Sequence, residues 1–135
     1  MIRYMLDTNM IAYAKNRRPE SVLQRLLQHD PSEICISAIT MAELEYGVCH
    51  SSMPGQNRLA LMMFLSGITL LPFGTDAALA YGEIRHRLKI RGNIIGANDL
   101  LIAAHARSLG LTLVTHNTRE FSRIEGLQLE DWVMP

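Results

Sequence analysis

Short apolar runs of strand length alternate with longer segments of helical periodicity, and this alternation restricts the fold more than any other feature. The runs are bounded by polar or turn-forming residues and cover 2–6, 33–37, 68–73 and 111–115. A strand, a helix and a further strand in succession favour parallel pairing, because the helix carries the chain back across the sheet. The sequence therefore predicts an α/β fold of three layers, with a short, mainly parallel sheet between helices.

Helix boundaries are marked by capping and stop residues. Ser37 is expected to cap the helix that follows the second strand, and Thr75 to cap a helix that stops at Gly92. Pro19 suits the first turn of a helix and Pro54 the start of another. The remaining expected elements are helices at 10–16, 57–66 and 98–110 and a short fifth strand at 127–129.

Composition limits the class of protein. The 135 residues are 48% hydrophobic and 19% charged, which predicts one globular domain spanning 1–135. The net charge is zero with histidine neutral, so any binding to nucleic acid must come from local patches. Cys35 and Cys49 form no CxxC pair, and no signal peptide or membrane-length apolar segment is apparent. We expect a cytoplasmic protein with reduced thiols.

Four acids follow different strands of the expected sheet. Asp7 comes directly after the first strand, and Glu43 lies about two turns into the helix after the second. Asp99 opens an apolar helix, and Glu120 follows the fourth strand. Ligands of open α/β sheets bind beyond the carboxyl ends of the strands. We therefore expect these four carboxylates to converge at that edge.

Each acid also has a purely structural interpretation. Asp7 suits a helix cap, and Asp99 suits the first turn of a helix, where the dipole favours a negative charge. Glu120 fits the surface of a turn. Glu43 fits a solvated helix position, but Ile39 and Tyr46 at helical spacing place it on a mostly apolar face that is expected to point inward.

Carboxylates crowded at one place need a compensating cation, or some of them stay protonated. A site of oxygen ligands without histidine or cysteine favours Mg²⁺ or Mn²⁺ over zinc. Small polar residues beside the acids are candidates for orienting them and bound water, namely Thr8, Asn9, Thr115 and Asn117. The histidines match no zinc motif; His29, His50 and His86 are expected at the surface, and His105 and His116 in structural roles.

A basic segment lies between the third strand and the apolar helix, where five cationic side chains occur at Arg85, His86, Arg87, Lys89 and Arg91. Such a run is usually a solvated helix face. If it borders the acidic site, it is suited to hold an RNA backbone while the acids act on it.

Four motifs resemble the PIN-domain ribonucleases: MLDTN at 5–9, SAITMAELEYG at 37–47, GANDLLIAAHA at 96–106 and LVTHNTREF at 113–121. The resemblance runs from Tyr4 to Trp132 and is strongest to the VapC toxins of bacterial toxin–antitoxin pairs. It implies that Asp7, Glu43 and Asp99 bind metal, with Glu120 at a more variable fourth position. Thr8, Asn9, Thr115 and Asn117 match the family's polar accessory positions.

The same resemblance implies an endoribonuclease dependent on Mg²⁺ or Mn²⁺ that halts translation. Its expected substrate is structured RNA, mainly tRNA cut in the anticodon stem-loop, and initiator tRNA in the branch that this sequence resembles. It also implies a homodimer and a VapB-type antitoxin that covers the acidic groove in a larger complex. The apolar segment LALMMFL at 59–65 suits part of those contacts, or else plain core.

Three other functions fit parts of the pattern. A phosphatase with Asp7 as nucleophile normally has a second acid two residues later, where this chain has Asn9. A non-catalytic signalling domain with an acidic metal pocket needs a phosphoacceptor Asp and a partner Lys, and neither is apparent. A PIN fold that only binds RNA needs no catalytic acids, yet all four are present.

Overall fold

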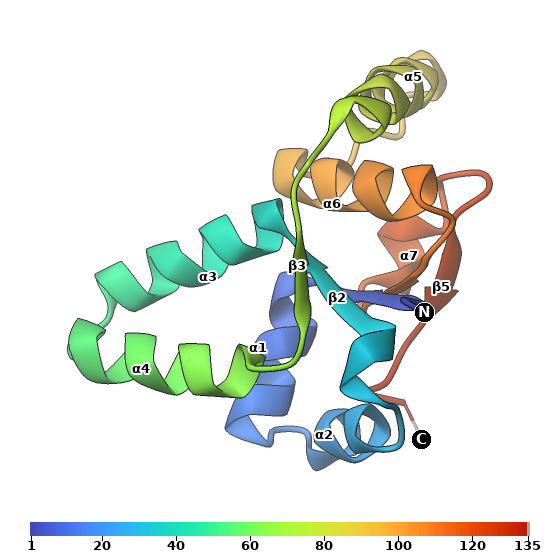
Figure 1. Cartoon of the computed structure of the whole chain (residues 1–135). Coiled ribbons are helices and arrows are strands. Elements are labelled where there is room, and N and C mark those ends of the chain that lie inside the picture. The colour runs from blue at the N-terminus through green and yellow to red at the C-terminus, as the bar shows by residue number, and fades with distance from the viewer. Residues whose placement is uncertain (135) are drawn as a thin grey trace.

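A single parallel sheet lies at the centre of the computed structural model, which describes residues 1–134. Its five strands run in the order β3-β2-β1-β4-β5, and every neighbouring pair is parallel (Figure 1). The strands are β1 Tyr4–Leu6, β2 Ile34–Ser37, β3 Thr69–Leu71, β4 Thr112–Val114 and β5 Gln128–Glu130. The predicted α/β class and parallel sheet are confirmed, and all strand carboxyl ends lie at one edge.

Helices connect the strands and cover both faces of the sheet. They are α1 Thr8–Asn16, α2 Glu20–Leu27, α3 Ala38–His50, α4 Pro54–Leu65, α5 Thr75–Arg91, α6 Ala97–Ser108 and α7 Thr118–Phe121, with a 3₁₀ turn at Pro31–Glu33. In Figure 1, α5 and α6 lie on one side of the sheet and α1 and α2 on the other, while α3 and α4 extend away as a pair.

Alternation along the strands divides the core into two parts, because successive side chains point to opposite faces. Tyr4 and Leu6 of β1 pack with α1, α2 and Trp132, whereas Met5 between them packs with α5, α6 and α7. The β2 residue Cys35 joins Met5 in the core, whereas Cys49 of α3, also expected in apolar surroundings, is exposed. Both faces of β1 are covered, which explains why all three of its residues are apolar and buried.

Several predicted boundaries need correction. Ser37 caps α3 as predicted, and Gly92 ends α5 in the left-handed conformation with φ of 70°. Thr75, however, is the first helical residue of α5 and not its cap, a position that belongs to Gly74. The first helix begins at Thr8 and not at Met10, because Asp7 caps it. Helix α7 was not predicted, since its four residues are too short for a periodic pattern.

Among residues 1–134, no helix is both long and apolar enough to cross a membrane.

Candidate functional site

Asp7 holds the junction between β1 and α1. Its backbone N–H donates to the carbonyl of Val114 in β4 at 3.1 Å, and its Oδ1 accepts from the backbone N–H of Met10 at 2.9 Å. The residue is 6% exposed. The helix cap is therefore real, but a cap alone does not require burial of a charge, which is costly without a counter-charge.

The pKa of Asp7 is raised from 3.8 to about 6, chiefly because burial disfavours the charged form. Hydrogen bonds from Thr115 and from the Met10 amide lower this pKa, whereas the charges of Asp99 and Glu43 raise it further. The structure thus places the Asp7 carboxylate within the electrostatic reach of two other acids.

Glu43 is held by two neutral donors from other helices. The hydroxyl of Thr8 in α1 donates to Glu43 Oε1, and Nδ2 of Asn98 in α6 donates to Oε2 at 3.2 Å. One wall of an open groove is formed here by Thr8, Ile39, Ala42, Glu43, Tyr46 and Asn98. The predicted inward-facing position is right in part, because Glu43 is half-buried and Ile39 packs against the core, whereas Tyr46 is 69% exposed.

Asp99 lies in the first turn of α6, one of the most buried helices. Burial raises the pKa of its carboxyl, and the charges of Glu43 and Glu120 raise it further. The predicted position at the edge of a buried helix is confirmed, since the neighbouring Leu100 is 2% exposed whereas Asp99 is half-buried.

Glu120 comes from α7, just beyond β4. Nδ2 of Asn117 donates to Glu120 Oε2 at 3.0 Å, while the backbone N–H of Asn117 donates to Thr115 Oγ1 at 3.0 Å. These two hydrogen bonds therefore link the end of β4 to the fourth acid. The charge of Glu120 raises the pKa of Asp99, and the charges of Asp99 and Glu43 raise the pKa of Asp7. All four predicted acids are therefore linked electrostatically at the carboxyl edge of the sheet.

The polar residues predicted to support the acids are only partly placed as expected. Thr8, Thr115 and Asn117 bind acids or one another, whereas Asn9 is exposed. The role of Asn98 was not predicted, although it directly precedes Asp99 in the motif at 96–106. Spacing alone does not indicate which acid an amide will contact.

Two of the histidines are held by contacts with other elements of the fold. His105 is buried with Nδ1 2.8 Å from Ser37 Oγ, so it links α6 to the cap of α3. Burial lowers the pKa of His105, and a hydrogen bond to the backbone of Pro72 partly opposes this shift. His29, predicted at the surface, is instead half-buried and its ring stacks on Trp132.

The donor set fits a hard divalent cation in its chemistry, since it offers carboxylate oxygens without histidine or cysteine. Within residues 1–134, no three acidic, imidazole or thiol side chains are positioned to bind one ion together. Mg²⁺ commonly uses only one or two carboxylates and completes its shell with water and substrate oxygens. The arrangement therefore provides negative charge and oxygen ligands at one edge, without a closed cage.

Residues 4–127 match the family model described as the PIN domain. The chain belongs to the PIN-domain family. Within that family it is 45% identical over 133 residues to Ribonuclease VapC2 of Haemophilus influenzae, covering 98% of this chain and all of that protein. It is 42% identical to the tRNA(fMet)-specific endonuclease VapC of Shigella flexneri, covering 98% and 99%.

Solved structures of VapBC complexes agree with the likeness to the VapC ribonucleases. The VapBC2 complex from Rickettsia felis bound to a promoter DNA fragment matches with a TM-score of 0.89 and 44% identity. The DNA-bound VapBC complex from Salmonella typhimurium matches with a TM-score of 0.92 and 41% identity. Each match covers 98% of this chain and 99% of the solved chain.

Proposed function

We propose that this PIN-domain protein is an endoribonuclease toxin, dependent on Mg²⁺ or Mn²⁺, that acts in the cytoplasm on structured RNA. The observation that carries the proposal is the convergence of four carboxylates from four segments, with neutral donors and no paired arginine or lysine among the contacts described above. Such a site is incomplete without a cation. The relatives named as ribonucleases support cleavage of RNA as the reaction.

The proposed metal-binding acids are Asp7, Glu43 and Asp99, with Glu120 as the fourth acid, and some of them act on the cation through bound water because no three within residues 1–134 are positioned on one ion. A bound divalent ion supplies an activated water and neutralises charge on the phosphodiester. The chain's own contribution is orientation. Thr8 and Asn98 fix the two oxygens of Glu43, and Asn117 fixes one oxygen of Glu120, so these carboxylates are aimed before substrate arrives.

We infer tRNA as the favoured substrate class, cut in the anticodon stem-loop, with initiator tRNA as the specific candidate. This inference is supported by two relatives over 40% identical, from Shigella flexneri and Salmonella typhimurium, that are named tRNA(fMet)-specific endonucleases.

The proposed protein partners are a VapB-type antitoxin and a second copy of this chain, assembled in a larger complex. Support comes from the similar solved chains, which were determined as VapBC complexes. The outer face of α4 offers apolar surface for such contacts, because Leu59, Met62 and Met63 are each more than 60% exposed. The alternative prediction that this segment is plain core holds for Leu61, which is 2% exposed, and in part for Phe64 and Leu65, which pack against the core.

The experiment is incubation of the purified protein with total cellular RNA, with mapping of cleaved ends. Discrete cleavage is expected with Mg²⁺ or Mn²⁺ and none with EDTA. Asp7→Asn should abolish cleavage because it removes a charge but keeps a capping group. The matched control is Asp76→Asn, which removes an acid from the first turn of α5 and should cleave like the unaltered chain.

Absence of cleavage by the folded, metal-supplied protein would contradict the proposed activity. Unchanged cleavage by Asp7→Asn would contradict the assignment of the site, and full activity in EDTA would contradict the dependence on metal. Cleavage ends that fall outside tRNA would retain the activity and replace the proposed substrate.

A further inference from the structure

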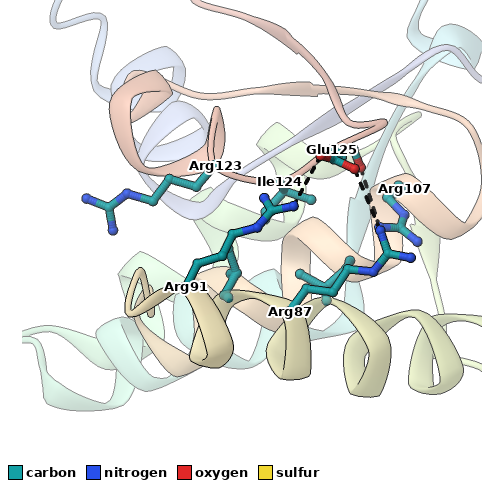
Figure 2. Close-up of a pocket in the computed structure, with 8 residues that line it drawn as sticks. Arg87, Arg91, Arg107, Arg123, Ile124 and Glu125 are labelled. Atoms are coloured by element: carbon teal, nitrogen blue, oxygen red, sulfur yellow. Dashed lines mark hydrogen bonds and ion pairs between the residues drawn. The ribbon is translucent and has the colours of Figure 1, made fainter.

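Four arginines gather on the molecule from three separate segments. Arg87 and Arg91 lie one turn apart on α5, Arg107 lies near the end of α6, and Arg123 follows α7. Figure 2 shows the side chains of Arg87, Arg91 and Arg107 near Glu125, whereas the Arg123 side chain lines the same pocket but extends away from this acid. We call these four residues the arginine cluster.

Two carboxylates only partly neutralise the arginine cluster. Glu125 pairs with Arg91 at 3.2 Å and with Arg87 at 3.6 Å. Glu83 pairs with Arg107 at 3.1 Å and with Arg87 at 3.6 Å. Four guanidinium groups against these two acids leave an excess of two positive charges, in a chain whose net charge is zero. The excess is accessible, since about half of each Arg87 and Arg91 side chain is exposed.

The arginine cluster borders the four acids. The backbone N–H of Arg123 donates to the carbonyl of Glu120 at 3.1 Å, so the two residues share one turn. The Arg123 guanidinium donates to the carbonyl of Ile94 at 3.3 Å, in the segment that leads into α6 and Asp99. Arg107 lies eight residues beyond Asp99, which is about 12 Å along the helix. The positive surface thus begins beside the acids and continues away from them.

We propose that the arginine cluster binds backbone phosphates of the RNA substrate beyond the cleaved bond. This inference rests on the proposed ribonuclease function. The acidic edge repels a polyanion, so affinity for RNA must come from positive charge elsewhere on the surface. Forked guanidinium donors match phosphate oxygens, and they fix the position of a strand without reading its sequence.

An acidic segment of a protein partner has related chemistry. RNA is favoured because the arginine cluster is continuous with the acids through Glu120 and Arg123, where the same phosphate chain has to lie for cleavage. The span of about 12 Å between Asp99 and Arg107 indicates that the contacted phosphates lie beyond those flanking the cleaved bond. The arginine cluster would therefore favour long or folded RNA over short fragments.

The test is binding of unfractionated tRNA by the full chain carrying Asp7→Asn, measured by filter retention over a series of salt concentrations. Adding Arg87→Gln and Arg91→Gln should weaken binding roughly tenfold and lower the salt slope by about one to two. In the cleaving protein the same pair should raise KM and leave kcat nearly unchanged. Glu125→Gln should strengthen binding about threefold, because it frees two arginines from their counter-charge.

The matched control is Arg3→Gln. Arg3 precedes β1 at the opposite edge of the sheet and forms one ion pair with Glu33 at 3.1 Å, so the change also removes one charge and one exposed pair. It should leave tRNA affinity close to that of the parent. Melting temperatures of all variants check that each is folded.

Unchanged tRNA binding by the arginine variants would overturn the inference, as would weaker binding on Glu125→Gln, which would indicate a structural role. Loss of antitoxin binding with normal tRNA binding would also overturn it in favour of an acidic protein segment. If the parent cleaves RNA and the arginine variants match it in KM, this inference alone fails. If the parent neither binds nor cleaves RNA, the proposed function fails with it.

Discussion

The acidic edge and the arginine cluster are neighbours, yet the charged groups in them have opposite kinds of partner. At the acidic edge, like charges gather and their supports are neutral: a hydroxyl, amides and a backbone N–H. In the arginine cluster, opposite charges meet directly, with Glu83 and Glu125 between guanidinium groups. In the first arrangement Asp7 is buried and the other three acids are half-buried, whereas the second arrangement is largely exposed to solvent.

The partners of the charged groups distinguish a site that needs a bound ion from a surface that is stable without one. Desolvation and mutual repulsion raise the pKa values of Asp7 and Asp99, so the acidic edge holds an electrostatic cost that a cation would remove. Exposed pairs such as Arg91 with Glu125 are screened by water and carry little energy in either direction. Catalysis, stability at different pH values and stability at different salt concentrations test this difference.

The largest expected effect is on catalysis. Asp99→Asn should lower kcat on RNA by on the order of 10²-fold or more, because it removes a proposed ligand charge from the acidic edge. Glu120→Gln should lower kcat by about tenfold, since the charge of Glu120 raises the pKa of Asp99 whereas the pKa of Asp7 is raised by the charges of Asp99 and Glu43. Steady-state cleavage of tRNA measures both.

Glu83→Gln provides the matched control for these variants, because it removes an acid that pairs with arginines instead. Its kcat should stay within about twofold of the parent. An equal loss of kcat in Glu83→Gln and Asp99→Asn would remove the functional distinction between the two regions.

The next effect is on stability and depends on pH. The folded state raises the pKa of Asp7 from 3.8 to about 6, so between these values the folded chain keeps a proton that the unfolded chain releases. The contribution of Asp7 to stability is therefore lost as pH rises through this window. Without metal, Asp7→Asn should match the parent near pH 3.5 and exceed it by about 1–3 kcal/mol at pH 7.

Urea unfolding in EDTA at pH 3.5, 5 and 7 measures the difference between the two chains. A parent that is more stable than Asp7→Asn at pH 7 without metal would contradict a raised pKa for this carboxyl.

The smallest effect is expected in the arginine cluster. Arg91→Gln should change the free energy of unfolding by no more than about 0.5 kcal/mol, because its pair with Glu125 is exposed. Raising the salt concentration should reduce even this difference, whereas the Asp7 effect should persist because that carboxylate is buried. Urea unfolding at low and high salt measures both, and a loss of several kcal/mol for Arg91→Gln would show that the cluster holds the fold.

Much of the fold was predictable because strand and helix periods are local properties of the sequence. The apolar strands and the caps at Ser37 and Gly92 could be predicted from their own neighbours. Strand order was not predictable, since it depends on which apolar faces meet after the chain has folded. The same limit explains His29, whose partner Trp132 lies more than a hundred residues away.

The candidate site was likewise predictable only in part. The gathering of the four acids followed from their positions after parallel strands, which is a rule of topology. The exposure of Tyr46 beside Glu43 did not follow, because helical spacing identifies which residues share a face but not how far another element covers that face. The partnership of Arg91 with Glu125 was also invisible, since it joins segments that only the sheet brings together.

The two oxygens of Asp7 point to a conflict between durability and activity. One oxygen caps α1, a task that asparagine performs as well, while the negative charge is a burden to the folded chain without metal. Replacing Asp7 with asparagine would thus make the metal-free fold more durable, and under the proposed function it would also leave the molecule inert. The proposal therefore accounts for an aspartate at this position, because the charge that weakens the metal-free fold is the charge that a bound cation needs.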